Sequence, residues 1–199
     1  MNRILLMGPP GAGKGTQGTL LADALGVPHI TTGGMFRDEI SRGSALGLDV
    51  AGTLQSGGFV DDALTTALLR SRLEQGDAAE GFVLDGYPRT VPQAGALDDL
   101  LGESGEEVDT AILLEVADEV LLARLMARSD GRADDGPDVI RERIARYHEL
   151  TAPVALRYEE RGLLRRINGA FPAELVLAAV LAAARAVHHP LVTHGSPLR

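Results

Sequence analysis

The amino-acid sequence predicts an α/β fold of three layers, with a central parallel sheet between two layers of helices. Short apolar runs that are typical of buried strands alternate along the chain with longer segments in which apolar residues recur at helical spacing. Strands that alternate with helices in this way form parallel sheets covered on both faces. In addition, 199 residues with 45% apolar side chains are enough for one full core and make a second core unnecessary.

Each expected element follows from a local pattern. Strands are expected at the apolar runs 3–8, 81–86 and 110–116, and a shorter candidate covers 163–169. Helices are expected at 18–26, where Gly26 ends the pattern, at 118–128, where acidic residues occupy the first turn, at 137–162, opened by Pro137, and at 172–187. Residues 188–199 show no periodicity and are expected to form a disordered tail, so residues 1–187 are predicted to form a single domain.

Charge and composition exclude several classes of function. A formal net charge of −9 and a pI of about 5.0 give no support to binding of nucleic acid or of an acidic membrane, so any anionic ligand must be held locally. The chain has no cysteine, which excludes disulfides and thiolate-bound metals and fits a reducing compartment. The apolar run 4–7 is too short for a signal peptide or a membrane span, and we expect a cytoplasmic protein.

The stretch GPPGAGKGTQ, residues 8–17, has the spacing of a phosphate-binding loop. Gly8, Gly13 and Lys14 supply the skeleton G-x-x-x-x-G-K, which follows an expected strand and precedes an expected helix. Glycines allow backbone N–H groups to surround phosphate oxygens, and the positive end of the helix dipole adds to the attraction. Lys14 is the only lysine among 19 lysine and arginine residues, which singles out the position where a compact ammonium must reach between phosphates.

The residue after this lysine departs from the usual pattern. A loop of this kind normally has Ser or Thr there as a magnesium ligand, whereas this chain has Gly15, with Thr16 one position later. The departure argues against a GTPase or a motor-type site. The loop instead resembles that of the nucleoside monophosphate kinases, and most closely that of the adenylate kinases, in which magnesium is held mainly by the phosphates and by waters.

The resemblance recurs in order along the chain and covers roughly residues 1–185. Its further motifs are TTGGMFR at 31–37, DGYPRTVPQA at 85–94, GRADD at 131–135 and RERIARYHELTAP at 141–153. Several motifs in the family's order are far more specific than any one of them. The resemblance implies a three-layer P-loop kinase fold with a small lobe that binds the nucleoside monophosphate, at about 31–60, and a short lid at about 127–135.

The resemblance also assigns roles to individual residues. The residues that bind ATP would be Gly11, Ala12, Gly13, Lys14, Gly15, Thr16, Arg124, Arg128 and Phe171. Those that bind AMP would be Thr32, Arg37, Gly58, Phe59, Val60, Gly86, Tyr87, Pro88, Arg89, Gln93, Arg132 and Arg143. The catalytic set would be Lys14, Asp85, Arg89, Arg128, Arg132 and Arg143, with Asp85 orienting water bound to Mg²⁺. Gathered arginines of this kind neutralise charge on a transferring phosphoryl group.

Two features distinguish the chain from other members of the family that it resembles. Only the residues SDG separate Arg128 from Arg132, so the lid has neither the length nor the cysteines for structural zinc. The expected cofactor is therefore Mg²⁺ with ATP, and no zinc. Gly34 stands where the family usually has an acid, which leaves the water network around magnesium, and the rate, in question.

The function that these features predict is reversible, magnesium-dependent phosphoryl transfer from ATP to AMP, which gives two ADP. We expect a monomer whose partners are the nucleotides ATP, AMP and ADP, with no nucleic acid and no membrane. Two alternatives stay open. A kinase for UMP or CMP would tend to have a small residue in place of Thr32 and an asparagine near Gln93. A nucleotide-binding protein with weak turnover is favoured only by Gly34, whereas the set of arginines favours catalysis.

Overall fold

The computed structural model describes residues 2–55, 58, 60–127 and 136–186. In this part of the chain, parallel strands form one five-stranded sheet in the order β2-β3-β1-β4-β5. The strands are β1 (Asn2–Met7), β2 (His29–Thr31), β3 (Gly81–Asp85), β4 (Thr110–Glu115) and β5 (Leu164–Asn168). The predicted parallel sheet is therefore confirmed. The sequence pattern does not predict β2, because three residues are too few to show a period.

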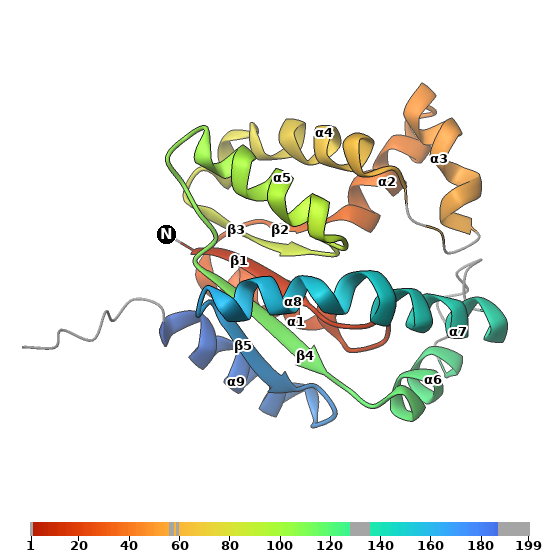
Figure 1. Ribbon diagram of the computed structural model, residues 1–199, viewed down its shortest axis with the longest axis vertical. Helices are drawn as coiled ribbons and strands as arrows, with labels where there is room; N and C mark the ends of the chain where they lie inside the picture. Colours follow the sequence, from red (N-terminus) through yellow and green to blue (C-terminus); the bar gives the residue numbers. More distant parts are fainter. Residues whose placement is uncertain (1, 56–57, 59, 128–135, 187–199) are drawn as a thin grey trace, which may run out of the picture.

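Helices connect the strands and cover the sheet (Figure 1). They are α1 (Lys14–Leu25), α2 (Thr32–Ser41), α3 (Ala45–Gln55), α4 (Asp62–Leu73), α5 (Val91–Gly102), α6 (Asp118–Met126), α7 (Pro137–Arg146), α8 (Ala152–Glu160) and α9 (Ala173–Arg185). A short 3-10 turn, Gly76–Ala78, precedes β3.

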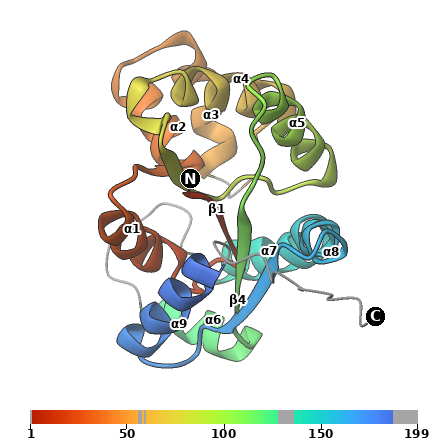
Figure 2. The same ribbon diagram turned by 90° about the vertical axis from the view of Figure 1, so that its left-hand side faces the viewer.

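The sheet separates two apolar cores. Side chains along a strand alternate between its faces, and in β1 Leu5 and Met7 belong to one core whereas Ile4 and Leu6 belong to the other. Helices α4, α5 and α8 pack in the first core, and α1, α6, α7 and α9 pack in the second. Figure 2 shows α1 and α8 on opposite sides of β1 and β4. The predicted three-layer arrangement is confirmed.

The predicted helices need two corrections. The helix expected at 18–26 is only the later part of α1, which begins at Lys14 because Gly13, with a φ of 97°, ends the loop one residue earlier. The helix expected at 137–162 is interrupted by a π-helical segment, Tyr147–Thr151, between α7 and α8. Pro153 lacks an N–H group and its ring excludes the carbonyl four residues before it. The N–H of Ala152 bonds instead to Tyr147 O, five residues back.

The helices α2 to α5 are absent from the sequence expectations, and two of them form a separate feature. Helices α2 and α3, drawn in orange, lie beyond one end of the sheet in Figure 1. Phe36, Val50 and Val60 give this region a small apolar cluster of its own. The boundaries of the lobe (31–60), of the lid (127–135) and of the single domain (1–187) remain predictions. Most of the lid and the tail 188–199 lie outside the described residues.

Candidate active site

The glycine-rich loop joins the carboxyl end of β1 to the first turn of α1. Its glycines have backbone conformations that other residues rarely adopt, with φ values of 142° at Gly8 and 97° at Gly13. A Cβ atom at Gly8 would lie 2.7 Å from the backbone oxygen of Leu114, so the loop passes directly against β4. Ala12 is only 2% exposed and packs into the core, so that its side chain does not face a ligand. The loop is thus a backbone cradle at the amino end of a helix.

Lys14 lies over this cradle. Its Nζ donates hydrogen bonds to Gly8 O at 2.8 Å and to Pro9 O at 2.9 Å. Burial lowers the pKa of the Lys14 ammonium below its ordinary value of 10.5, Asp85 partly offsets this, and Arg89 and Arg143 lower the pKa further. A phosphate bound at the loop would raise the pKa of this ammonium, because a nearby negative charge favours its charged form.

Twelve of the predicted site residues line one cleft beside the loop, with a volume of about 1080 Å³ that includes space open to solvent. They are Gly11, Gly13, Lys14, Gly15, Thr16, Thr32, Arg37, Asp85, Gly86, Arg89, Arg124 and Arg143. Five of these twelve carry a positive charge, whereas Asp85 is the only acid among the described residues of the lining. In a chain of net charge −9, such a concentration of positive charge marks a site for a multiply charged anion.

Asp85 lies on the lining of this cleft, at the end of β3. It pairs in register with Leu6 of β1 on one side and with Thr31 of β2 on the other. The carboxyl ends of parallel strands are where ligands bind in open α/β sheets. His29 also faces Asp85, with its Nε2 atom 3.9 Å from Asp85 Oδ2, and burial lowers the pKa of His29.

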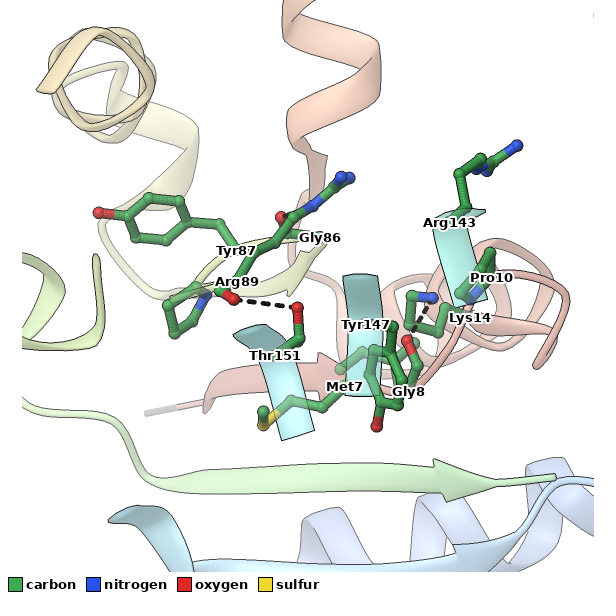
Figure 3. A pocket seen from close by; sticks show the side chains of 12 residues that line it. Met7, Gly8, Pro10, Lys14, Gly86, Tyr87, Arg89, Arg143, Tyr147 and Thr151 are labelled. Carbon is green, nitrogen blue, oxygen red and sulfur yellow. Dashed lines mark hydrogen bonds between the residues drawn. The ribbon is translucent and has the colours of Figure 1, made fainter. Parts of the chain in front are cut away.

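Arg89 is held in place from two elements. Its Nε donates to Gly86 O at 2.8 Å, and its own backbone oxygen accepts from Thr151 Oγ1 at 2.9 Å, as drawn in Figure 3. Burial lowers the pKa of Arg89, and Arg143 lowers it further, while Asp85 raises it. Figure 3 shows a second cavity, which shares Lys14, Arg89 and Arg143 with the cleft. Three positively charged side chains therefore line both cavities.

A smaller pocket of about 340 Å³ adjoins the cleft and shares Thr32, Gly33, Gly86 and Arg89 with it. Its other lining residues are Phe36, Leu54, Gly58, Val60, Thr65 and Gln93. The walls are mainly apolar, and Gln93, which is 3% exposed, contributes an amide. Such a lining suits a flat, partly polar group such as a nucleobase.

Several predicted residues lie elsewhere. Tyr87 and Pro88 line the cavity of Figure 3, where the hydroxyl of the buried Tyr87 is hydrogen-bonded to Thr66 at 2.7 Å, so this ring supports the site from the core. Phe171 is 57% exposed and lines none of these three cavities. The predictions for Phe59, Arg128 and Arg132 fall outside the described residues.

Arg124 reaches the cleft from α6. It donates to Gly169 O at 3.0 Å and to Ala170 O at 3.4 Å, and so ties α6 to the segment that precedes Phe171. Phe171 therefore follows residues whose backbone borders the Arg124 side chain, although its own ring is not part of these cavity linings. A role for this segment would involve the backbone rather than the ring.

Sequence reasoning missed other residues of the site. Tyr147 and Thr151 line the cavity of Figure 3 from the π-helical segment. Burial, reinforced by Glu115 and opposed by Arg166, raises the pKa of the Tyr147 hydroxyl to about 12. Both residues lie inside the motif RERIARYHELTAP, which could have indicated them.

Thr31 is a further residue that the sequence analysis did not assign. It caps α2, because its Oγ1 accepts from the N–H of Gly34 at 2.9 Å. A Cβ atom at Gly34 would lie 2.6 Å from that oxygen, so a glycine at this position accommodates the cap as it stands. A threonine directly before a helix is a common N-cap, and this was the signal for Thr31 available in the sequence.

Among the described residues that line the cleft, side-chain oxygen atoms come from Asp85 and from the hydroxyls of Thr16, Thr31 and Thr32. Among the described residues, no three His, Asp or Glu side chains come together as a ready metal site. Likewise, no helix within the described ranges is both long and apolar enough to span a membrane.

Comparisons with known proteins agree with this geometry. The family model for adenylate kinase matches residues 6–163. The chain is 46% identical to an adenylate kinase of Stenotrophomonas maltophilia (strain R551-3), over 91% of this chain and 98% of that protein. It is 47% identical to an adenylate kinase of Xanthomonas euvesicatoria pv. vesicatoria (strain 85-10), over 84% and 90% of the two chains. With the loop, the cleft and the neighbouring pocket in these positions, the chain belongs to the adenylate kinase family.

Proposed function

We propose that the chain transfers the terminal phosphoryl group of ATP to AMP in the cleft beside the loop, reversibly and with two ADP as products. The observation that carries this proposal is the gathering of Lys14, Arg37, Arg89, Arg124 and Arg143 around one cleft that continues into a small pocket. Phosphoryl transfer requires little covalent chemistry of a protein, and its catalysis consists of positioning and of neutralising charge. This arrangement is suited to both.

The residues divide between the two nucleotides. The loop and Lys14 would hold the phosphates of ATP, with Arg124 toward its base. Arg37, on α2, would hold the phosphate of AMP, and the pocket lined by Gln93 would hold the adenine. Arg89 and Arg143 lie with Lys14 along the same cavity, and would neutralise the group in transfer from several sides. The assignment of Arg128 and Arg132 to phosphate rests on the sequence resemblance.

The donor set of the cleft fits Mg²⁺. This ion typically takes one or two carboxylates and completes its shell with substrate phosphates and water. Asp85 is one carboxylate, half-buried among five cations, and Thr16 offers a hydroxyl on the same lining. Bound magnesium would neutralise charge on the nucleotide phosphates. Asp85 would orient its water, and the lysine and arginines would hold the phosphate oxygens.

The alternatives receive less support from the site. Thr32 and Gln93 both line the small pocket, where a hydrogen-bonding threonine and glutamine suit adenine better than the residues expected of a UMP or CMP kinase. A protein that only binds nucleotide would not need Arg89 and Arg143 beside Lys14. We further propose a cytoplasmic monomer, which the lack of cysteine and a cleft formed by one chain support; light scattering tests the oligomeric state.

A panel of acceptors tests this proposal. The purified chain is given ATP, Mg²⁺ and, separately, AMP, UMP, CMP or GMP, and the formation of ADP is followed. We expect kcat/KM for AMP to exceed that for UMP and CMP by orders of magnitude, because buried hydrogen-bonding groups left unpaired penalise the wrong base strongly. Equal efficiencies for AMP and UMP would favour the pyrimidine alternative, and binding without turnover would favour the alternative of a nucleotide-binding protein.

A further inference from the structure

The amide of Gln93 is held at both ends by groups of opposite hydrogen-bonding character. Its Nε2 donates to Asp62 Oδ1 at 2.6 Å, and its Oε1 accepts from the backbone N–H of Arg89 at 2.7 Å. The second oxygen of Asp62 accepts from Thr90 Oγ1 at 2.7 Å. Asp62 begins α4 and Thr90 caps α5, so these contacts join the amino ends of two helices beside the small pocket.

These partners determine which way the amide points. An ionised carboxylate only accepts hydrogen bonds, and a backbone N–H only donates them. If the Gln93 amide turned over, its oxygen would face the Asp62 carboxylate and its NH₂ group would face the N–H of Arg89. Both hydrogen bonds would be lost, because two acceptors would face each other at Asp62 and two donors would face each other at the Arg89 N–H. The contacts therefore allow one orientation of the amide and oppose the other.

The orientation leaves a defined pattern for a ligand. Each amide N–H₂ has two donors and each amide oxygen has two acceptor positions. Gln93 uses one of each within the protein, so one donor and one acceptor remain on a side chain that lines the small pocket. Adenine offers N1 as an acceptor beside its 6-amino donor, which matches this pattern. Hypoxanthine offers an N1–H donor beside an O6 acceptor, which matches only the turned amide.

We propose that Asp62 is a specificity-determining positioning residue, which holds Gln93 in the orientation that pairs with adenine and thereby excludes 6-oxopurine monophosphates. The inference rests on the proposed function, because it takes the small pocket to be the site of the acceptor's base. Asp62 is absent from the linings of both the cleft and the pocket, so it acts through Gln93 rather than by touching the substrate.

The substitution Asp62→Asn tests this role at nearly constant shape. The introduced amide can take either orientation itself, because the hydroxyl of Thr90 can donate or accept. A turned Gln93 amide would then find a donor on the introduced side chain, while the N–H of Arg89 would still favour the original orientation. We expect the ratio of kcat/KM for AMP to that for IMP to fall by about tenfold or more. The change should lie mainly in KM for IMP, with KM for ATP and kcat with AMP close to the wild-type values.

A matched control separates positioning from charge. Asp61 is the adjacent acid, and its Oδ1 caps α4 by accepting from Ala63 N at 3.0 Å and Leu64 N at 3.1 Å. Asp61→Asn removes the same charge one position away and keeps a good cap, so we expect the wild-type ratio of AMP to IMP. If Asp61→Asn relaxed the ratio as much as Asp62→Asn, the effect would be one of charge and the proposal would be overturned.

Other outcomes are equally decisive. A folded Asp62→Asn protein with the wild-type ratio would overturn the proposal, as would a wild-type protein that uses IMP as well as AMP. If Asp62→Asn does not fold, Asp62→Ser removes the contact with Gln93 and is measured in the same way. The wild-type preference for AMP over UMP and CMP is a separate measurement. Its absence would contradict the proposed function, whereas its presence with an unchanged AMP to IMP ratio would contradict only the role of Asp62.

Discussion

Replacing Lys14 with methionine should lower kcat strongly and change the free energy of unfolding little. Met keeps most of the apolar stem and removes the ammonium that lies over the loop. Removing one preorganised donor to the charge that develops in a transition state costs about 10²–10³ in kcat, equivalent to about 3–4 kcal/mol. We expect at least this loss with ATP and AMP, because Lys14 lies along the same cavity as Arg89 and Arg143.

The same substitution should change the free energy of unfolding little. Lys14 would lose two hydrogen bonds to backbone oxygens, at 2.8 and 2.9 Å, each worth about 1.5–3 kcal/mol for a charged donor. Against this, burial lowers the pKa of the ammonium, which means that the folded protein disfavours the charged form relative to the unfolded chain. The two effects oppose each other, and we expect a net change within about 1–2 kcal/mol.

The assay compares kcat, from coupled detection of ADP, with unfolding free energy, from denaturant titration. Arg141→Met is the matched control, since Arg141 pairs with Asp138 at 3.0 Å on the exposed face of α7 and lies outside the cleft. The control should keep both values. A folded Lys14→Met protein with turnover within about tenfold of the wild type would refute the placement of Lys14 at the transferring phosphates.

Three further predictions concern protons and metal. Burial lowers the pKa of Lys14 from 10.5, and a bound phosphate would raise it again. ATP binding at pH values between the lowered pKa and 10.5 should therefore be accompanied by uptake of a proton. Calorimetry in buffers of different ionisation enthalpy should detect this uptake in the wild type and not in Lys14→Met. The pKa of Tyr147 is raised from 10.0 to about 12, so its contribution to stability is complete below pH 10.0 and is lost as the pH rises through about 12. Denaturation at a series of pH values should show a smaller loss over this range in Tyr147→Phe, and an equal loss would contradict the burial of the hydroxyl. EDTA should abolish turnover and Mg²⁺ alone should restore it; recovery that required zinc would contradict the cofactor assignment.

The parts of the fold that the sequence predicts are those with strong local patterns. The runs at 81–86 and 110–116 each contain an unbroken stretch of buried apolar residues, 82–84 and 111–114, and they form β3 and β4 with small changes at the ends. β2 has three residues, and its place at the edge of the sheet depends on pairing with β3 rather than on its own sequence. The helix boundary at Tyr147–Thr151 depends on Pro153 and on how the chain accommodates one missing N–H group.

The residues of the site also include some that local sequence motifs predict and some that only the structure reveals. Lys14 and Asp85 could be predicted because each lies in a short motif at the end of a strand, and the topology brings those ends together. The contact between Asp62 and Gln93 joins residues 31 positions apart on different helices, and neither residue alone indicates it. Hydrogen bonds between side chains of helices that meet only when the layers pack are available from the structure alone.

The central claim is that this cleft transfers a phosphoryl group between two adenine nucleotides. The most direct test follows the reaction of ATP, AMP and Mg²⁺ with the purified chain by phosphorus NMR, with Lys14→Met as the control. We predict that one ATP and one AMP disappear for every two ADP that form, that the reverse reaction occurs from ADP alone, and that the control is slower by at least about 10². Release of inorganic phosphate without phosphorylation of AMP, or no reaction in the folded wild-type protein, would contradict it.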